Sequence, residues 1–259
     1  MITQLWKKLC DGCAYTLIPF LTGANLAPEV FVSDGFYLNW RQMKRSMHKA
    51  KEYAKGVCLD IGAGKAPYKR YLEPRCEKYI ITDSEKTHSH MFKDSRTDFI
   101  VAEATALPFE DLSIDTVVMT QVLEHVFEYE KALSEAVRVL KTDGVMLLSV
   151  PFIYHAHATP YDFHRFSEYG LRALLQKHGL EVVEWHYQGY LGTTLFCIIN
   201  GFIWEKLACV RSLRNTLLLP FVLGIFTCNN LLGLLLDVIP AKHFSPNFFV
   251  IAKKSTCTS

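Results

Sequence analysis

The chain has 259 residues and a formal net charge of +2; half of the residues are hydrophobic and 21% are charged. This composition is typical of an ordered globular protein with one large or two small domains, and it excludes a disordered chain or a collagen-like fibre. Because the charge is almost balanced, there is no molecule-wide basic field of the kind that attracts nucleic acid, and no nucleic-acid partner is expected.

Residues 1–56 are predicted to be mainly helical and to form an N-terminal extension. Cys10-Asp-Gly-Cys13 has the spacing of a redox or zinc motif, but it lacks a second cysteine pair and a preceding strand, so no such chemistry is expected from it. The stretch 41–55 carries six basic residues and one acidic residue. It is interpreted either as a solvated helix face or as a surface attracted to anions.

From Val57 onward, short apolar runs alternate with helical segments, which is the pattern of βαβ units around a parallel sheet. The apolar spacing from Leu133 to Leu140 predicts a helix that ends at 142–144, and Ser167 is predicted to cap a helix that stops at Gly179. The fold class is therefore α/β, with a doubly wound, Rossmann-like sheet. The predicted strands are 57–61, 79–82, 99–102, 115–120, 145–150, 181–186 and 247–252.

A glycine loop, Leu59-Asp-Ile-Gly-Ala-Gly64, is predicted where the first strand meets its helix. Glycine is needed there because the backbone turns tightly and a ligand approaches it closely. A dinucleotide fingerprint would need a third glycine at position 67, which is proline. Asp83 follows Gly64 by 19 residues, at the end of the second strand. A carboxylate there can accept hydrogen bonds from both hydroxyls of a ribose, although an aspartate in such a position also caps turns.

These segments, together with VAEATALPFEDLSIDTVVMTQVLEHV and EAVRVLKTDGVMLLSVPF, resemble the class I S-adenosylmethionine-dependent methyltransferases of the type 11 group, from about Val57 to Trp185. The resemblance implies S-adenosylmethionine as the cofactor. Ala66 stands at the third small position of the glycine motif, which is tolerable if its φ is negative. Glu124 and His125 are expected either to face the substrate or to begin a helix. The cofactor-binding residues implied are Asp60, Gly62 and Gly64 at the methionine part, Asp83 at the ribose, Glu103 and Ala104 at the adenine, and Gln121 in the segment lining the cofactor.

The loop from Pro151 to Ser167 concentrates three histidines, an aspartate and an arginine at the carboxyl edge of the predicted sheet. It resembles the H-x-x-P-x-D-[FY]-x-R-[FY] stretch of type 11 methyltransferases encoded with glycan-assembly genes. We predict that His157 or His164 is the general base, that Asp162 orients it and that Arg165 grips an anionic acceptor group. Alternatively, Asp162 and Arg165 pair and only pin the loop. No metal ligands are predicted, since the loop has no suitably spaced histidine pair.

Residues 188–245 are predicted to be an apolar helical insertion before the last strand. No charged residue occurs from Asn215 to Leu236, a length close to the ~20 residues that span a bilayer, but Pro220 and Asn229-Asn230 disfavour a spanning helix. If strands 181–186 and 247–252 pair in one sheet, both ends of the insertion lie on one side of any membrane. The insertion is then a helical hairpin, an interfacial helix pair, or a cap on the domain or on a second subunit.

The expected domains are a helical extension at 1–56, a cofactor-binding domain at 57–187 plus 246–254, and the insertion at 188–245. The expected function is methylation of a sugar or lipid-linked glycan hydroxyl, in the cytoplasm or at the inner face of the cytoplasmic membrane. Membrane contact through 188–245, peripheral or as a hairpin, and a homodimer are expected with it. The alternatives are a methyltransferase for a small hydrophobic acceptor such as a quinone precursor, and a non-catalytic membrane-associated scaffold with the same fold.

Overall fold

The computed structural model describes residues 31–85, 99–209 and 213–255. These residues divide into two compact units, one made of 31–44 and 189–246, the other of 45–188 and 247–255. The described N-terminal residues up to Lys44 thus group with the insertion, whereas the sequence predicts a separate extension up to residue 56. The Cys10–Cys13 pair lies outside the described residues.

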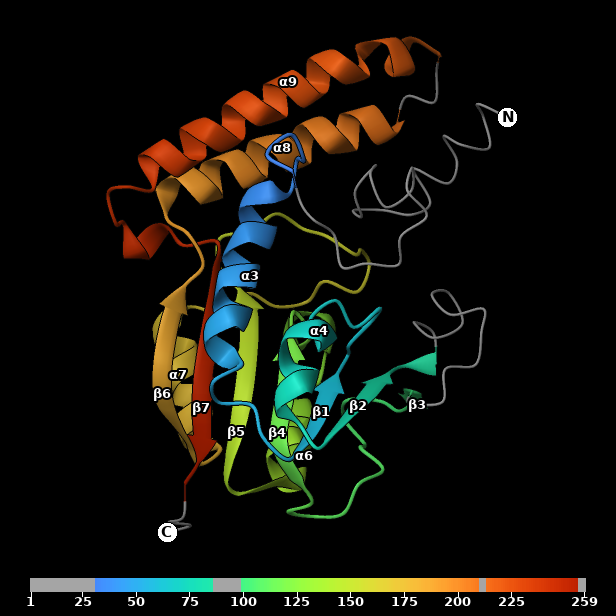
Figure 1. The fold of residues 1–259 in the computed structure, drawn as a ribbon, viewed down its shortest axis with the longest axis vertical. Coiled ribbons are helices and arrows are strands. Elements are labelled where there is room, and N and C mark those ends of the chain that lie inside the picture. Colours follow the sequence, from blue (N-terminus) through green and yellow to red (C-terminus); the bar gives the residue numbers. More distant parts are fainter. Residues whose placement is uncertain (1–30, 86–98, 210–212, 256–259) are drawn as a thin grey trace. The chain divides into compact units, whose positions relative to one another are not determined.

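The second unit is built on a seven-stranded sheet in the order β3-β2-β1-β4-β5-β7-β6 (Figure 1). β7 is antiparallel to both of its neighbours, and the other pairs are parallel. Because β1 lies between β2 and β4, the strand order reverses there, and the carboxyl end of β1 is a topological switch point where ligands bind in such sheets. The strands are β1 (Val57–Ile61), β2 (Lys78–Asp83), β3 (Phe99–Val101), β4 (Ile114–Thr120), β5 (Leu140–Pro151), β6 (Leu180–Tyr187) and β7 (Asn247–Lys254).

Helices cover both faces of this sheet. In Figure 1, α6 and α7 lie on one face and α4 on the other. Buried residues of α6 and α7, such as Leu133 and Leu171, join Leu59, Val117 and Met146 of the strands in one hydrophobic core, and the burial of this apolar surface is the main force that holds helices and sheet together. The helices of this unit are α4 (Lys69–Leu72), α6 (Tyr129–Val139), α7 (Glu168–Lys177) and the single turns η1 (Glu73–Arg75) and η2 (Leu123–His125), while α3 (Tyr37–Ala50) begins in the first unit and ends in the second.

Two details test the predicted helix ends. The Ser167 hydroxyl accepts a hydrogen bond from the backbone N–H of Gly170, which confirms the predicted cap of α7. The predicted start of the fifth strand is wrong, because α6 ends at Val139 and Leu140 already pairs with Ile114. The register shifts after Ile114, and the extra residues around Asp143, whose φ is 60°, are accommodated as a strand irregularity instead of a helix end.

The first unit contains a helical hairpin, α8 (Leu191–Cys209) and α9 (Leu213–Leu236), followed by the turn η3 (Lys242–Phe244). The pairing of β6 with β7 confirms that the chain leaves the sheet and returns to it on neighbouring strands. Asn200 and Asn230 are buried and bonded to each other at 3.1 Å, and Asn230 also donates to the backbone oxygens of Val32 and Asp34 at 2.7 Å. Asn230, one of the two neighbouring asparagines that disfavour a spanning helix, is thus part of a satisfied polar network. No helix in the described ranges is long and apolar enough to cross a membrane.

The two helices of the hairpin approach closely at Gly192 and Gly233. A Cβ on Gly192 would lie 2.2 Å from the backbone oxygen of Gly233, so Gly192→Ala must push the helices apart and is expected to destabilise the protein by roughly 1–3 kcal/mol. Gly224 in α9 is the matched control, because a Cβ there meets nothing within 4 Å. Gly224→Ala should be neutral or stabilising by up to about 1 kcal/mol. Urea unfolding of both variants checks this, and equal stabilities would contradict the close contact.

Candidate cofactor and acceptor site

The glycine loop after β1 lies at the switch point and is tied to the end of β2. Gly62 and Gly64 have φ of 63° and 52°, and a Cβ on Gly62 would lie 2.6 Å from the Val122 side chain. The Gly64 N–H donates to the Asp83 carboxylate at 2.8 Å. Ala66 has φ of 51°, so the condition of a negative φ is not met, and this residue adopts a left-handed conformation that costs a side-chain-bearing residue roughly 1–2 kcal/mol. The loop is therefore a cradle of tightly turned backbone in which Ala66 is strained.

Two carboxylates lie under this cradle. Asp60 is 1% exposed and accepts a hydrogen bond from the Tyr79 hydroxyl at 2.7 Å. Burial raises the pKa of Asp60 to about 7, and the charge of Asp83 adds to this, while the Tyr79 hydrogen bond opposes it. Each Asp83 oxygen accepts one backbone N–H, from Gly64 or Ser84, which leaves further lone pairs for a ligand.

The remaining predicted cofactor residues lie along the same edge of the sheet. The Ala102 N–H donates to the backbone oxygen of Asp83 at 2.9 Å, which sets Glu103 and Ala104 just beyond β3, with Glu103 exposed. Gln121 follows β4 with φ of 55°, and its side-chain amide donates to the Ser149 hydroxyl at 2.8 Å. Ser149 in turn donates to Gln188, which donates to Ser46. Sequence analysis missed this buried chain of hydrogen bonds, because its members are far apart in the sequence.

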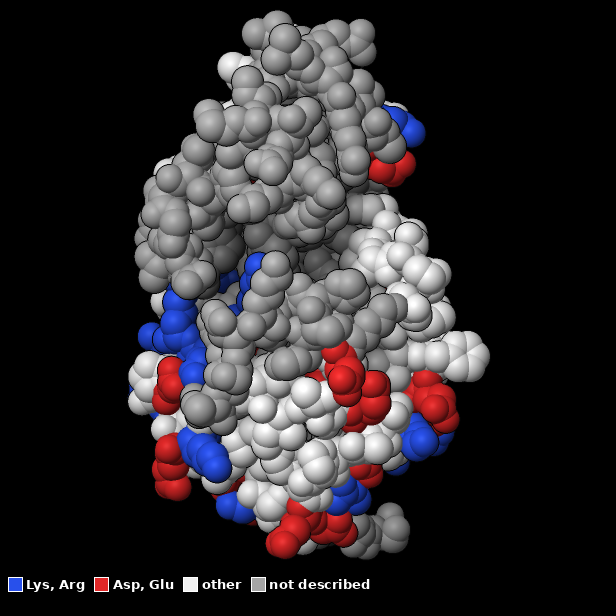
Figure 2. Space-filling view, turned by 90° about the vertical axis from the view of Figure 1, so that its right-hand side faces the viewer, with Lys and Arg blue, Asp and Glu red and all other residues white. Residues whose placement is uncertain are grey.

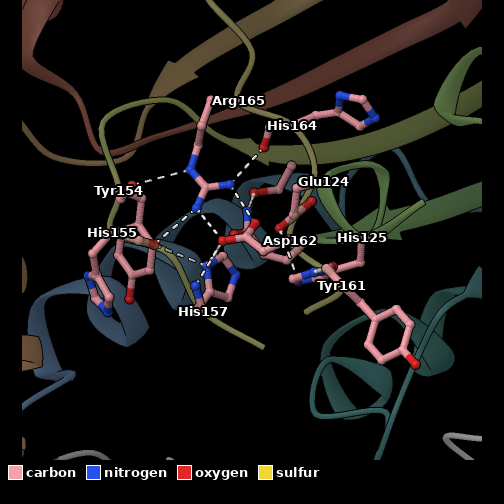
Figure 3. Close-up of polar contacts among 11 residues, drawn as sticks. Glu124, His125, Tyr154, His155, His157, Tyr161, Asp162, His164 and Arg165 are labelled. Atoms are coloured by element: carbon pink, nitrogen blue, oxygen red, sulfur yellow. Dashed lines mark hydrogen bonds and ion pairs between the residues drawn. The ribbon is translucent and has the colours of Figure 1, made fainter. Parts of the chain in front are cut away.

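The loop after β5 is organised around Arg165 (Figure 3). Its guanidinium binds both oxygens of Asp162, at 2.6 and 2.7 Å, and its other N–H groups donate to the backbone oxygens of Tyr154, His155 and His164. Burial alone would raise the pKa of Asp162, but hydrogen bonds from Arg165 and from the His157 backbone outweigh it and lower the pKa to about 2. Asp162 is therefore charged at every physiological pH.

Arg165 has no N–H group left to bind the molecule that would accept the methyl group. A guanidinium has five N–H groups, and all five are used within the loop. The expectation that Arg165 grips an anionic acceptor is therefore not supported by this geometry, and the alternative, in which Asp162 and Arg165 pair and pin the loop, describes the contacts.

The structure separates the two candidate bases. The His157 backbone N–H donates to Asp162 at 2.8 Å, and its Nδ1 lies 3.5 Å from the same carboxylate. Burial and the neighbouring His125 lower the pKa of His157, against the opposing effect of Asp162, so its ring is neutral near pH 7 and able to accept a proton. The His164 ring points away from Asp162 in Figure 3 and packs against Tyr129, with ring centres 4.6 Å apart. Asp162 can thus orient His157 but not His164.

Glu124 is a residue whose environment the sequence did not reveal. It lies in η2 and is fully buried, and within the described ranges neither of its carboxylate oxygens has a hydrogen-bond partner. Burial raises the pKa of Glu124 to about 8. The nearest basic atom is His125 Nε2, 3.8 Å away, and the His125 ring meets that of His157 at 4.9 Å. Glu124 thus lies in the first turn of η2, as a residue at a helix start would, but among the described residues the turn has no side-chain capping bond at its N-cap.

The charges on the surface are mixed. Figure 2 shows acidic and basic side chains beside one another on the described part of one face.

Comparisons with known proteins show similarity to methyltransferases. Residues 59–148 match the family described as a methyltransferase domain, type 11. The chain is 41% identical over 78 residues to the demethylmenaquinone methyltransferase of Renibacterium salmoninarum, covering 30% of this chain and 31% of that protein. It is 26% identical over 133 residues to a probable S-adenosylmethionine-dependent methyltransferase of Mycobacterium tuberculosis, covering 51% and 48%. The matches thus span about half or less of these relatives.

Solved structures share the fold. The [4+2]-cyclase SpnF aligns with a TM-score of 0.56 at 18% identity, over 83% of this chain and 82% of that one. The phosphoethanolamine N-methyltransferase 2 of Haemonchus contortus, in complex with S-adenosyl-L-methionine, aligns with a TM-score of 0.53 at 17% identity, over 82% of this chain and 53% of that one. The fold is therefore that of Rossmann-like methyltransferases, and the example of the cyclase shows that the fold alone does not determine the reaction.

The loop contacts predict that lysine cannot replace Arg165. A lysine has three donors and no planar fork, so Arg165→Lys leaves the buried Asp162 incompletely paired and should destabilise the protein by roughly 1–3 kcal/mol. Arg75 is the matched control, since it also contacts a carboxylate, Glu52, but both side chains are more than half exposed. Arg75→Lys should change stability little, because exposed pairs contribute little. Thermal unfolding of both variants checks this, and an equal effect would refute the positioning role.

Proposed function

We propose that this chain, whose residues 59–148 belong to the type 11 methyltransferase domain family, transfers the methyl group of S-adenosylmethionine to a small-molecule acceptor. The observation that carries the proposal is the pair of carboxylates, Asp60 and Asp83, beside a glycine loop at the switch point of the sheet. The match of the domain to the family supports the same cofactor.

The chemistry of these residues fits the cofactor. S-adenosylmethionine carries a sulfonium, an ammonium and a ribose diol but no phosphate, so its site needs carboxylates and open backbone and not a phosphate-binding lysine. Asp60 would face the positively charged methionine part, and Asp83 would accept from the ribose hydroxyls. Glu103, Ala104 and Gln121 would line the adenine and the cofactor, as the resemblance implies. When bound, the cofactor supplies a methyl group on a positively charged sulfur.

The loop after β5 would position the acceptor. Methyl transfer is an in-line displacement, so holding the acceptor atom in line with the methyl group provides much of the acceleration. Asp162 and Arg165 keep the loop in one conformation through their paired contacts. His157, held beside Asp162, takes the proton that the acceptor loses.

An apolar, ring-bearing acceptor such as a quinone precursor fits the surroundings of this loop best. Phe127, Tyr161 and Phe163 are large exposed rings, with Phe127 73% exposed, and the rings of Phe127 and Phe163 meet edge to face at 5.6 Å. Such rings can stack on an aromatic acceptor. The name of the demethylmenaquinone methyltransferase relative points the same way. A sugar or lipid-linked glycan hydroxyl is the second candidate, favoured by the sequence of the loop itself.

We further propose that the first unit contacts the inner face of the cytoplasmic membrane, where a lipid-soluble acceptor resides. Its helical hairpin and the residues between α9 and η3 expose several large apolar side chains. Such a surface is typical of a protein that lies on a bilayer. These side chains are Phe202, Phe221, Leu231, Leu235, Val238 and Ile239.

The cofactor proposal predicts that the chain binds S-adenosylmethionine and that Asp83→Ala abolishes binding. The variant removes both the ribose acceptor and the bond that holds Gly64 in place. Isothermal titration calorimetry measures this, and Asp143→Asn, an exposed aspartate where β5 begins, is the control that should bind normally. Absence of binding by the unmodified protein at millimolar cofactor would leave only the non-catalytic scaffold.

The environment of Asp60 predicts pH-dependent binding. With a pKa of about 7, Asp60 is largely neutral below pH 7, and a cationic ligand must first displace its proton. The dissociation constant should therefore rise, by up to about tenfold per pH unit, between about pH 7 and pH 5.5. Asp60→Asn should bind weakly with little pH dependence. Calorimetry over this range checks the prediction, which is rejected if the unmodified protein binds equally well throughout.

The acceptor proposal predicts that radiolabelled methyl groups pass from S-adenosylmethionine to reduced demethylmenaquinone, the electron-rich quinol, presented in liposomes. Leu235→Glu combined with Ile239→Glu should lower this transfer several-fold by weakening attachment to the bilayer, while cofactor binding stays unchanged. Glu77→Gln, an exposed change in the second unit, is the control. Label that enters only a lipid-linked oligosaccharide would favour the glycan candidate, and equal transfer by the double variant would exclude the membrane contact.

A further inference from the structure

The Glu124 carboxylate lacks a partner that its environment requires. It is fully buried, and within the described part of the chain neither oxygen accepts a hydrogen bond. An ionised carboxylate in such a place is unfavourable unless a cation or a donor reaches it. Methyl transfer as proposed above gives this side chain no task. Among the described residues, the two carboxylate oxygens of Glu124 are therefore unpaired, next to the loop after β5 that would position the methyl acceptor.

Two imidazole nitrogens next to Glu124 also have free lone pairs. His125 Nδ1 lies 2.7 Å from the Tyr161 backbone oxygen, which can only accept, so Nδ1 carries the proton and Nε2 does not. His157 Nδ1 likewise lies 3.3 Å from the His155 backbone oxygen and 3.5 Å from Asp162. Its Nε2 is then unprotonated as well. A histidine whose one nitrogen donates to a carbonyl or carboxylate is prepared to bind metal through the other.

The three side chains converge. One ligand atom from each of Glu124, His125 and His157 can be chosen so that all lie within 4.8 Å of one another, and Figure 3 shows the three side chains in one cluster with Asp162. An ion about 2.1 Å from each ligand needs them roughly 3–3.6 Å apart, which modest side-chain rotations provide. Glu124 and His125 come from η2 after β4, while His157 comes from the loop after β5. The spacing of residues within the loop after β5 alone therefore could not indicate these three ligands.

We propose that Glu124, His125 and His157 bind one divalent transition-metal ion of the Mn²⁺ to Zn²⁺ series. Two imidazoles and one carboxylate are the ligand set that these ions prefer, and three protein ligands leave positions open for water or an acceptor oxygen. This proposal departs from the expectation that the chain has no metal ligands. The competing explanation is that Glu124 is a neutral, protonated acid that needs no cation.

The position of the ion suggests a role for it in methyl transfer. This role rests on the proposed function. Val122, two residues before Glu124, contacts the glycine loop at Gly62, so the ion lies near the methyl donor site. A hydroxyl bound to a divalent ion loses its proton more readily than a free one. With the ion bound, the acceptor hydroxyl would release its proton to solvent water, and His157 would serve as a ligand in place of a base.

Metal binding by the full chain tests the inference without any acceptor. Protein treated with EDTA and dialysed is titrated with Co²⁺, followed by its visible absorption, and with Zn²⁺, followed by calorimetry. We expect one ion per chain and a rise in melting temperature with Zn²⁺. Glu124→Gln, His125→Gln and His157→Gln should each weaken binding at least tenfold, and His178→Gln, a partly exposed histidine at the end of α7, should not.

Glu124→Gln also shows whether weaker metal binding results from misfolding of the variant. Glutamine has the same shape and no charge, so this variant should fold at least as stably as the unmodified protein without metal, yet lose the Zn²⁺-dependent rise in melting temperature. The inference is overturned if no ion binds or if the three variants bind like the unmodified protein. Calorimetry with S-adenosylmethionine, run with and without Zn²⁺, reports on the proposed function separately. Cofactor binding without metal binding would refute only the metal site, and the reverse only the cofactor proposal.

Discussion

The parallel pairing of β1 with both β2 and β4 is the constraint on which the site depends. It brings the ends of three strands to one edge, so the glycine loop after β1, Asp83 at the end of β2 and the segment after β4 become neighbours. This proximity is seen in the hydrogen bond from Gly64 to Asp83. It is also seen at Gly62, where an added Cβ would meet the Val122 side chain. A change that weakened this pairing would separate the cofactor residues from the acceptor loop.

Three buried carboxylates at this edge have different environments, and this difference assigns their roles. Asp162 is paired with Arg165 and stays ionised, with a pKa of about 2, so it is a fixed structural charge. Burial raises the pKa of Asp60 to about 7 and that of Glu124 to about 8. Both of these carboxylates are more stable with a cation nearby. Environment, and not residue type, thus separates a structural carboxylate from the two that we propose to face ligands.

The strand pattern and the local motifs were enough to predict the fold, because alternating apolar runs, the Ser167 cap and the spacing from Gly64 to Asp83 depend on neighbouring residues. The start of β5 at Leu140 could not be predicted, since the pairing with Ile114 overrides a turn signal at 142–144. The pairing of Arg165 with Asp162 was one of two alternatives that the sequence of the loop left open, and the structure decides between them. The convergence of Glu124 with His157 was out of reach, because it depends on contacts between the segments that follow β4 and β5, which no local spacing encodes.

The central claim is that the edge at the carboxyl end of β1 holds S-adenosylmethionine beside the acceptor loop. A crystal structure of the protein grown with S-adenosylhomocysteine tests this most directly. The account predicts the ribose hydroxyls on Asp83, the amino-acid part beside Asp60 and the glycine loop, and the sulfur directed toward the side of the site where His157 lies. Ligand density away from Asp83, or a ligand sulfur facing away from the loop after β5, would contradict it.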